Sequence, residues 1–248
     1  MPILEFDCFN IGPLKIYGRQ LNNRPDFIVE SNSGIKEIDY LLFFDSRGVS
    51  SSYKSSLAKM MVDRVSGIKK TYLLVCRPLE LTIWATLVGF LQLNELAPER
   101  IVTNMRFVDF TPKKSTTLLE AIHQTEEIIG KDVAESYFVE NYHQPNEISK
   151  PLYSMRFNER YLRAIENIAR KSDLVVLNTP LTDRFCSWAR PRPRCFFDAQ
   201  LATNNFNRLI TKAKVVDFPT LTPLYTYDGV HFTPKGNRLI FDKIKDLL

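Results

Sequence analysis

The sequence predicts a three-layer αβα sandwich with a mostly parallel sheet of about five strands. Short apolar segments of strand length recur along the chain, and segments of helical length and spacing separate them. Strands that alternate with helices of about 10 to 15 residues favour a parallel sheet with helices on both faces. The chain has 248 residues, 44% of them hydrophobic and 25% charged, which is enough for one domain with a sizeable core.

The N-terminal third contains a lead-in and the first strand–helix unit. Residues 1–37 have mixed polarity with Gly and Pro punctuation, which predicts an irregular or short-stranded segment. The run IDYLLFFDS, which begins at Ile38, is nearly continuously apolar and is typical of a strand buried on both faces. A helix is expected over Val49–Val65, and the serine run at 50–52 is its expected N-cap.

The same unit recurs to the end of the chain. Further strands are expected in TYLLVCRP, ERIVTNMRF, SDLVVLNTP and KAKVVDFP, with helices over about Glu80–Leu96, Ser115–Ile129 and Asn158–Ala169. The closing helix is PKGNRLIFDKIKDLL, with Pro234 in its first turn. No fixed-period repeat or linker divides the sequence, so residues 1–248 are expected to form a single domain.

Composition and charge exclude several classes of protein. No apolar run reaches the roughly 20 residues of a membrane span, and acidic Glu5 and Asp7 do not suit a signal peptide. Acidic and basic residues interleave, so the net charge of +5 does not favour a nucleic-acid partner. The four cysteines are far apart and form no CxxC pair, which favours reduced thiols over a disulfide or zinc framework. A cytoplasmic protein without metal or cofactor is expected.

The loops after the strands are where chemistry is expected. In an open parallel sheet, ligands bind at the carboxyl ends of the strands. These loops begin near Ser46, Arg77, Arg106, Pro180 and Pro219.

Two of these loops carry candidate catalytic residues. Ser46 lies where the first strand turns toward the first helix, a position that exposes a nucleophile at the sheet edge; the alternative is that it only caps the helix. His231 follows the fifth strand, and Asp228 precedes it by three residues, a spacing that can bring a carboxylate to one imidazole nitrogen. These residues predict a Ser-Asp-His triad. The other histidines, His123 and His143, are expected to be surface or structural residues.

The two blocks F-D-S-R-G and D-G-V-H-F-T-P-K-G resemble those of the SGNH/GDSL hydrolase superfamily, and the likeness in element order covers about residues 38–248. The resemblance implies a flavodoxin-like SGNH hydrolase fold, with Ser46 as the nucleophile and the Asp228–His231 pair as its base. It further implies esterase, thioesterase or acyltransferase chemistry on an acyl ester or thioester through an acyl-enzyme intermediate. Hydrolysis is the default reaction and acyl transfer its close variant.

The chain departs from this family at the oxyanion donors. The family uses a glycine after its second strand and the asparagine of a G-x-N-D block after its third. Here the loop after the second strand reads C-R-P-L-E and contains no glycine, and the alignment puts Val108 at the asparagine. Asn104, Arg106 and Arg77 are the candidate replacements. The alternative for Asn104 is a packing or sheet-edge hydrogen bond within the strand, and for Arg106 an ion pair with Asp109.

The loop after the fourth strand concentrates positive charge around aromatic residues. It predicts an anionic acyl group, a phosphopantetheine arm or an acidic carrier protein as substrate or partner, and its alternative is a solvated surface loop. The residues concerned are Arg184, Arg190, Arg192 and Arg194, with Phe185 and Trp188 among them.

Two functions from different classes therefore compete. The first is a serine-dependent acyl-group enzyme. The second is a catalytically weakened SGNH-like protein that binds a partner or glycan, which the missing oxyanion blocks favour. A nucleotide-binding Rossmann protein is disfavoured because no G-x-G-x-x-G or P-loop follows any strand.

Overall fold

The structure is a computed structural model. It describes residues 6–21, 24–34, 37–50, 52–77, 83–104, 113–114, 126, 131, 152–153, 159–183, 185–188 and 195–248.

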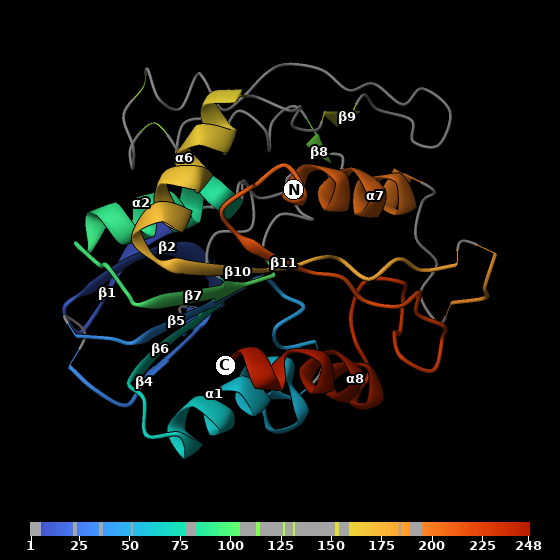
Figure 1. The fold of residues 1–248 in the computed structure, drawn as a ribbon, viewed down its shortest axis with the longest axis horizontal. Helices are drawn as coiled ribbons and strands as arrows, with labels where there is room; N and C mark the ends of the chain where they lie inside the picture. The colour runs from blue at the N-terminus through green and yellow to red at the C-terminus, as the bar shows by residue number, and fades with distance from the viewer. Residues whose placement is uncertain are drawn as a thin grey trace.

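A six-stranded sheet forms the centre of the described chain, in the order β11-β10-β7-β5-β6-β4 (Figure 1). Its strands are β4 (Ile28–Ser31), β5 (Tyr40–Phe44), β6 (Tyr72–Cys76), β7 (Arg100–Thr103), β10 (Asp173–Leu177) and β11 (Lys214–Val216). All neighbouring pairs are parallel except β4 with β6. The carboxyl ends of the five parallel strands therefore meet at one edge of the sheet.

Helices cover both faces of this sheet (Figure 1). One face carries α2 (Ile83–Leu93), α6 (Glu159–Lys171) and α7 (Cys195–Asn207), and the other carries α1 (Leu57–Gly67) and α8 (Pro234–Ile244). Two short 3₁₀ helices, η1 (Tyr53–Ser55) and η2 (Lys245–Leu247), precede α1 and follow α8. The prediction of a three-layer αβα fold with a mostly parallel sheet is confirmed.

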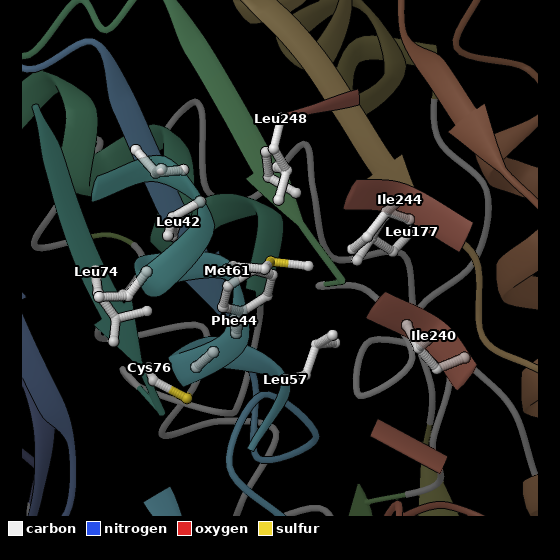
Figure 2. Close-up of a cluster of buried hydrophobic side chains, with 14 of the residues drawn as sticks. Leu42, Phe44, Leu57, Met61, Leu74, Cys76, Leu177, Ile240, Ile244 and Leu248 are labelled. Atoms are coloured by element: carbon white, nitrogen blue, oxygen red, sulfur yellow. The ribbon is translucent and has the colours of Figure 1, made fainter. Parts of the chain in front are cut away.

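Alternation along the central strands divides the core in two. In β5, Leu41 and Phe43 pack with α2, α6 and the end of α7, whereas Tyr40, Leu42 and Phe44 pack with α1 and α8. Figure 2 shows the second cluster, in which the side chains of β5 and β6 meet those of the two helices. Because every residue of β5 is buried, its apolar run has no polar face, as expected for a central parallel strand.

The N-terminal segment contains more regular structure than the sequence predicted. An antiparallel sheet of β1 (Phe6–Ile11), β2 (Leu14–Leu21) and β3 (Arg24–Pro25) packs Leu14 and Ile16 into the core beside α2. The next strand, β4, joins the main sheet as its sixth, antiparallel strand. Its partner β6 is distant in the sequence, so local pattern alone does not reveal this pairing.

One prediction about a helix start was wrong, and one helix was not predicted. The first helix begins at Leu57, and its N-cap is Ser56, whose Oγ accepts from Lys59 N at 3.1 Å, rather than a residue of the 50–52 run. The helix α7 was not predicted, because its first residues were assigned to the arginine-rich loop. Pro234 does occupy the first turn of the closing helix, as predicted.

Some predictions fall outside the described residues, including the helix over 115–129, His123 and His143. Within that predicted helix only Glu126 is described, and it is helical. The short antiparallel pair β8 (Lys113–Lys114) and β9 (Leu152–Tyr153) is also described in this part of the chain. Cys8, Cys76 and Cys186 are free thiols. Among the described helices, none combines the length and apolarity that a membrane crossing requires.

Candidate active site

Ser46 lies in a tight turn directly after β5. The turn is closed by a hydrogen bond from Gly48 N to Asp45 O at 3.0 Å, and Ser46 itself is half-buried. A Cβ at position 48 would lie 2.5 Å from Phe44 Cβ and 2.9 Å from Cys76 Sγ, so only glycine allows this close approach. The alternative that Ser46 caps α1 is wrong, since that helix begins eleven residues later at Leu57.

A buried ion pair holds the turn from both sides of Ser46. Asp45 and Arg47 are each 1% exposed, and the Arg47 guanidinium donates from Nε and Nη2 to Asp45 Oδ2 at 3.0 and 2.7 Å. The same guanidinium donates to Thr179 Oγ1 at 2.6 Å and to the Asn104 carbonyl. Arg47 therefore joins the ends of β5, β7 and β10, which explains an arginine where the SGNH pattern has another residue. Buried charges are tolerated when they are paired and hydrogen-bonded in this way.

His231 and Asp228 lie in a compact turn between β11 and α8. Asp228 is 2% exposed, and its Oδ1 accepts from the backbone N–H groups of Val230 at 3.0 Å and His231 at 2.8 Å. Its Oδ2 lies 2.9 Å from His231 Nδ1. Gly229 has a φ of +77°, in the left-handed region that glycine adopts without strain. The carboxylate is thus fixed by the backbone of its own turn before it contacts the imidazole.

The structure brings these two turns together. His231 Nε2 lies 3.2 Å from Ser46 Oγ, although the residues are 185 positions apart. The imidazole side chain is 26% exposed and the Asp228 side chain 3% exposed. A continuous chain of contacts therefore runs from a buried carboxylate through a partly exposed imidazole to a hydroxyl. Such a chain can take a proton from the hydroxyl as it attacks an electrophile.

Asn104 lies against the serine turn from the neighbouring strand. The alternative interpretation placed Asn104 inside the strand. β7 ends at Thr103, so Asn104 directly follows the strand. Its Oδ1 accepts from Asp45 N at 3.0 Å. The residue is 4% exposed, and its Nδ2 is buried without a hydrogen-bond partner among the residues that the structure describes. A buried amide N–H in this state is rare and is available to an acceptor outside the described residues.

Arg77 occupies the position after β6 where the SGNH family has its glycine. Its φ of +58° lies in the left-handed region that glycine favours. Its backbone N–H donates to Phe44 O at 2.9 Å. Its guanidinium donates to Val49 O at 3.0 Å and lies 3.7 Å from the Asp26 carboxylate. These contacts give Arg77 a structural role between the loops. Arg106, Val108 and Asp109 lie outside the described residues.

The arginine-rich loop is described only in part. Arg184, Arg190, Arg192 and Arg194 lie outside the described residues. Trp188 is 8% exposed, and its Cε2 lies 3.7 Å from where a Cβ of Gly229 would be, so the indole packs on the Asp228–His231 turn. Phe185, by contrast, is 83% exposed.

Sequence reasoning missed three buried amide residues of α7, of which only Gln200 contacts the turn that contains His231. Gln200, Asn204 and Asn207 are buried on this helix and donate or accept hydrogen bonds with the loops after β10 and β11. Their spacing of four and three residues is the available signal, but it becomes visible only once a helix is assigned there. Within the described residues, no group of three or more His, Cys, Asp or Glu side chains is placed to hold a metal ion.

Comparisons with known proteins give matches among solved structures. No protein-family model matches the chain, and no curated protein matches it. An acetyl xylan esterase from the rumen bacterium Butyrivibrio proteoclasticus is 12% identical over 88% of this chain, with a TM-score of 0.40. An active-site mutant of a family two carbohydrate esterase from Clostridium thermocellum is 10% identical over 87%, with a TM-score of 0.43. A protein described as a GDSL-like lipase, from Bacteroides ovatus, is 9% identical over 87%, with a TM-score of 0.46.

These likenesses are low in both sequence identity and TM-score, and they assign no family to the chain. The resemblance to SGNH/GDSL hydrolases rests on the F-D-S-R-G and D-G-V-H blocks of the sequence. The chain spans 65%, 64% and 53% of the three structures, respectively. At such identities, and with TM-scores below 0.5, the neighbours carry no inference about the reaction or the substrate of this chain. Any such inference has to come from its own site residues.

Proposed function

We propose that the chain is a serine-dependent esterase-type hydrolase in which Ser46, His231 and Asp228 form the catalytic triad. The observation that carries this proposal is the unbroken contact chain from Asp228 Oδ2 to His231 Nδ1 at 2.9 Å and from His231 Nε2 to Ser46 Oγ at 3.2 Å. Both distances are within the range that proton transfer requires. Recognition of a triad rests on such geometry and roles rather than on sequence position.

In the proposed reaction, Ser46 Oγ attacks the carbonyl carbon of an ester or thioester while His231 Nε2 takes its proton. The ionised Asp228 accepts from Nδ1–H, fixes the tautomer and stabilises the imidazolium that forms. When the tetrahedral intermediate collapses, the bond to the leaving group breaks and His231 returns the proton to it. A water molecule, activated by the same imidazole, then releases the acid from the acyl-enzyme and restores the Ser46 hydroxyl. Acyl transfer is the variant in which another nucleophile replaces this water.

The proposed oxyanion donors are the side-chain amide of Asn104 and the backbone N–H of Ser46. Support for Asn104 comes from its buried Nδ2, which has no partner in the described part of the chain, and from its Oδ1, which accepts from the backbone N–H of Asp45, the residue before the nucleophile. A donor that is already oriented and dehydrated stabilises developing negative charge without reorganisation. In this proposal Asn104 replaces the family's oxyanion asparagine, which the alignment had put at Val108.

The substrate side of the proposal rests on the loop that contains Trp188. Its indole packs on Gly229, next to the catalytic turn, and the surrounding arginines of the sequence favour an anionic or carrier-bound acyl group. Exposed charges are screened beyond about 10 Å at 0.1 M salt, so recruitment through this loop should weaken as salt is added. Equal use of neutral and anionic acyl donors would leave the loop as a solvated surface.

The experiment that tests the proposed function is an ester-hydrolysis assay on the native chain and on two variants. With p-nitrophenyl acetate as the probe, Ser46→Ala should lower turnover to the uncatalysed background, because it removes the hydroxyl that lies 3.2 Å from His231 Nε2. Asp228→Asn should lower kcat far more than it changes KM, since it disturbs the base and not substrate binding. Native turnover that survives Ser46→Ala would refute the proposal.

A further inference from the structure

The helix α7 presents a row of buried amide side chains to the loops of the candidate active site. Gln200, Asn204 and Asn207 are 1%, 5% and 0% exposed. Buried amides destabilise a fold unless their donors and acceptors find partners. Asn204 accepts from Thr179 N at 2.9 Å and donates to Thr179 O at 2.8 Å, and Asn207 donates to Asn178 Oδ1 at 2.8 Å. Asn204 and Asn207 thus hydrogen-bond the segment that follows β10.

Gln200 contacts the catalytic turn itself. Its Nε2 donates to Gly229 O at 2.6 Å. Its Oε1 accepts from Thr182 N at 3.2 Å and from Thr182 Oγ1 at 3.1 Å. The amide is therefore fixed at both ends, and it connects α7, the loop after β10 and the turn that contains His231.

The Gly229 carbonyl is coupled to the catalytic carboxylate through one peptide unit. The C=O of Gly229 and the N–H of Val230 belong to the same planar group, so fixing the direction of one fixes the other. Val230 N donates to Asp228 Oδ1 at 3.0 Å, and Asp228 Oδ2 contacts His231 Nδ1 at 2.9 Å. The orientation set by Gln200 is passed through this peptide plane to the carboxylate and from it to the imidazole.

We propose that Gln200 is a positioning residue for the reaction: it fixes the Gly229–Val230 peptide plane and so keeps the Asp228 and His231 side chains in position relative to Ser46. This inference rests on the proposed function of the triad. Gly229 has the positive φ of +77° and no side chain, and its carbonyl accepts from Gln200 Nε2 at 2.6 Å and, at the longer distance of 3.4 Å, from Thr182 Oγ1. Without Gln200 the peptide plane keeps only the longer contact with Thr182, so the Val230 N–H that Asp228 Oδ1 accepts from is less firmly oriented.

Loss of positioning has a kinetic signature that differs from loss of stability. A displacement of about 1 Å in a catalytic group can cost about 100-fold in rate. Because Gln200 has no contact with the nucleophile, its removal should lower kcat by about 10- to 100-fold and leave KM nearly unchanged. It should also weaken the Asp228–His231 hydrogen bond, which is observable as the low-field Nδ1–H resonance in ¹H NMR.

The matched pair of variants for this test is Gln200→Met and Asn207→Leu. Each replaces a buried amide of α7 with an apolar side chain of similar volume, but Asn207 contacts Asn178 and not the catalytic turn. Both variants should lower the melting temperature. Only Gln200→Met should lower kcat on p-nitrophenyl acetate and shift or broaden the low-field resonance. If Gln200→Met does not fold, Gln200→Glu keeps an oxygen for Thr182 and removes the donor to Gly229, with the same expected fall in kcat.

The outcomes separate this inference from the function on which it rests. The role of Gln200 is overturned, and the triad left intact, if the native chain is active but Gln200→Met loses no more kcat than Asn207→Leu and keeps the low-field resonance. The same holds for Gln200→Glu where it is used in place of Gln200→Met. A native chain without turnover would overturn the proposed function and the role of Gln200 with it. A selective fall in kcat with a displaced resonance supports the positioning role.

Discussion

Truncation of Asn104 to alanine removes two functions of one buried amide, and the structure lets each be weighed. The Oδ1 atom accepts from Asp45 N at 3.0 Å, so its loss leaves a buried backbone N–H without a partner. Such an orphaned donor lowers the free energy of unfolding by about 1–3 kcal/mol. The Nδ2 atom has no partner among the described residues, so its loss removes no hydrogen bond from the described part of the fold.

The effect on catalysis should be larger than the effect on folding. If Nδ2 donates to the oxyanion, its removal should lower kcat by about 10²–10³-fold, equivalent to about 2.7–4 kcal/mol of transition-state stabilisation. Since the bond strengthens only as charge develops, kcat and kcat/KM should fall by the same factor while KM stays constant. Steady-state hydrolysis of p-nitrophenyl acetate measures both constants, and urea unfolding measures the stability.

Asn237→Ala is the matched control for this experiment. Asn237 is 0% exposed, and its Nδ2 donates to Ser55 O at 2.9 Å, away from the triad. Its truncation should lower the free energy of unfolding to a similar extent and leave kcat close to native. The reasoning is refuted if Asn104→Ala loses no more kcat than Asn237→Ala, or if its loss lies entirely in KM.

Two further predictions concern stability. Arg47→Leu leaves the Asp45 carboxylate buried without its cation and should lower the free energy of unfolding by about 3–5 kcal/mol in urea, whereas adding Asp45→Asn should restore part of it; no restoration would contradict the ion-pair account. Burial and the hydrogen bond to Glu30 raise the pKa of Tyr72 from 10.0 to about 12, so the folded state favours its protonated form. The stability that this adds is complete below pH 10 and is lost as pH rises toward 12, so the stability difference between native and Tyr72→Phe should shrink over that window; a constant difference would speak against it.

The positions of the parallel strands along the chain could be predicted from the sequence because each depends on a strong local pattern. The run around Leu41 is apolar on both faces, which indicates a central strand. The three-residue spacing of Asp228 and His231 predicted a turn that brings the carboxylate to the imidazole, and the two side chains are in contact at 2.9 Å. Glycine and proline signals placed the closing helix correctly at Pro234. These features are each encoded within fewer than ten consecutive residues, where sequence reasoning is most secure.

The features that sequence reasoning missed depend on contacts between distant segments. Asn104 was one of three candidate donors in the sequence, and its place directly after β7 became clear only from the strand end at Thr103, a boundary that the apolar pattern does not fix. Arg47 looked like a departure from the family pattern, but its partners lie on three different strand ends. Gln200 belongs to a helix whose buried face is made partly of amides, so hydrophobic periodicity gives it no signal.

The most direct measurement for the account is the reaction of the native chain with a fluorophosphonate, followed by intact-mass analysis. The reagent modifies a serine only when an adjacent base and oxyanion donors activate it. The contact of Ser46 Oγ with His231 Nε2 at 3.2 Å predicts one adduct per chain, located on Ser46 and absent in Ser46→Ala. A native chain that gains no adduct, or an adduct that persists in Ser46→Ala, would contradict the assignment of Ser46 as the nucleophile.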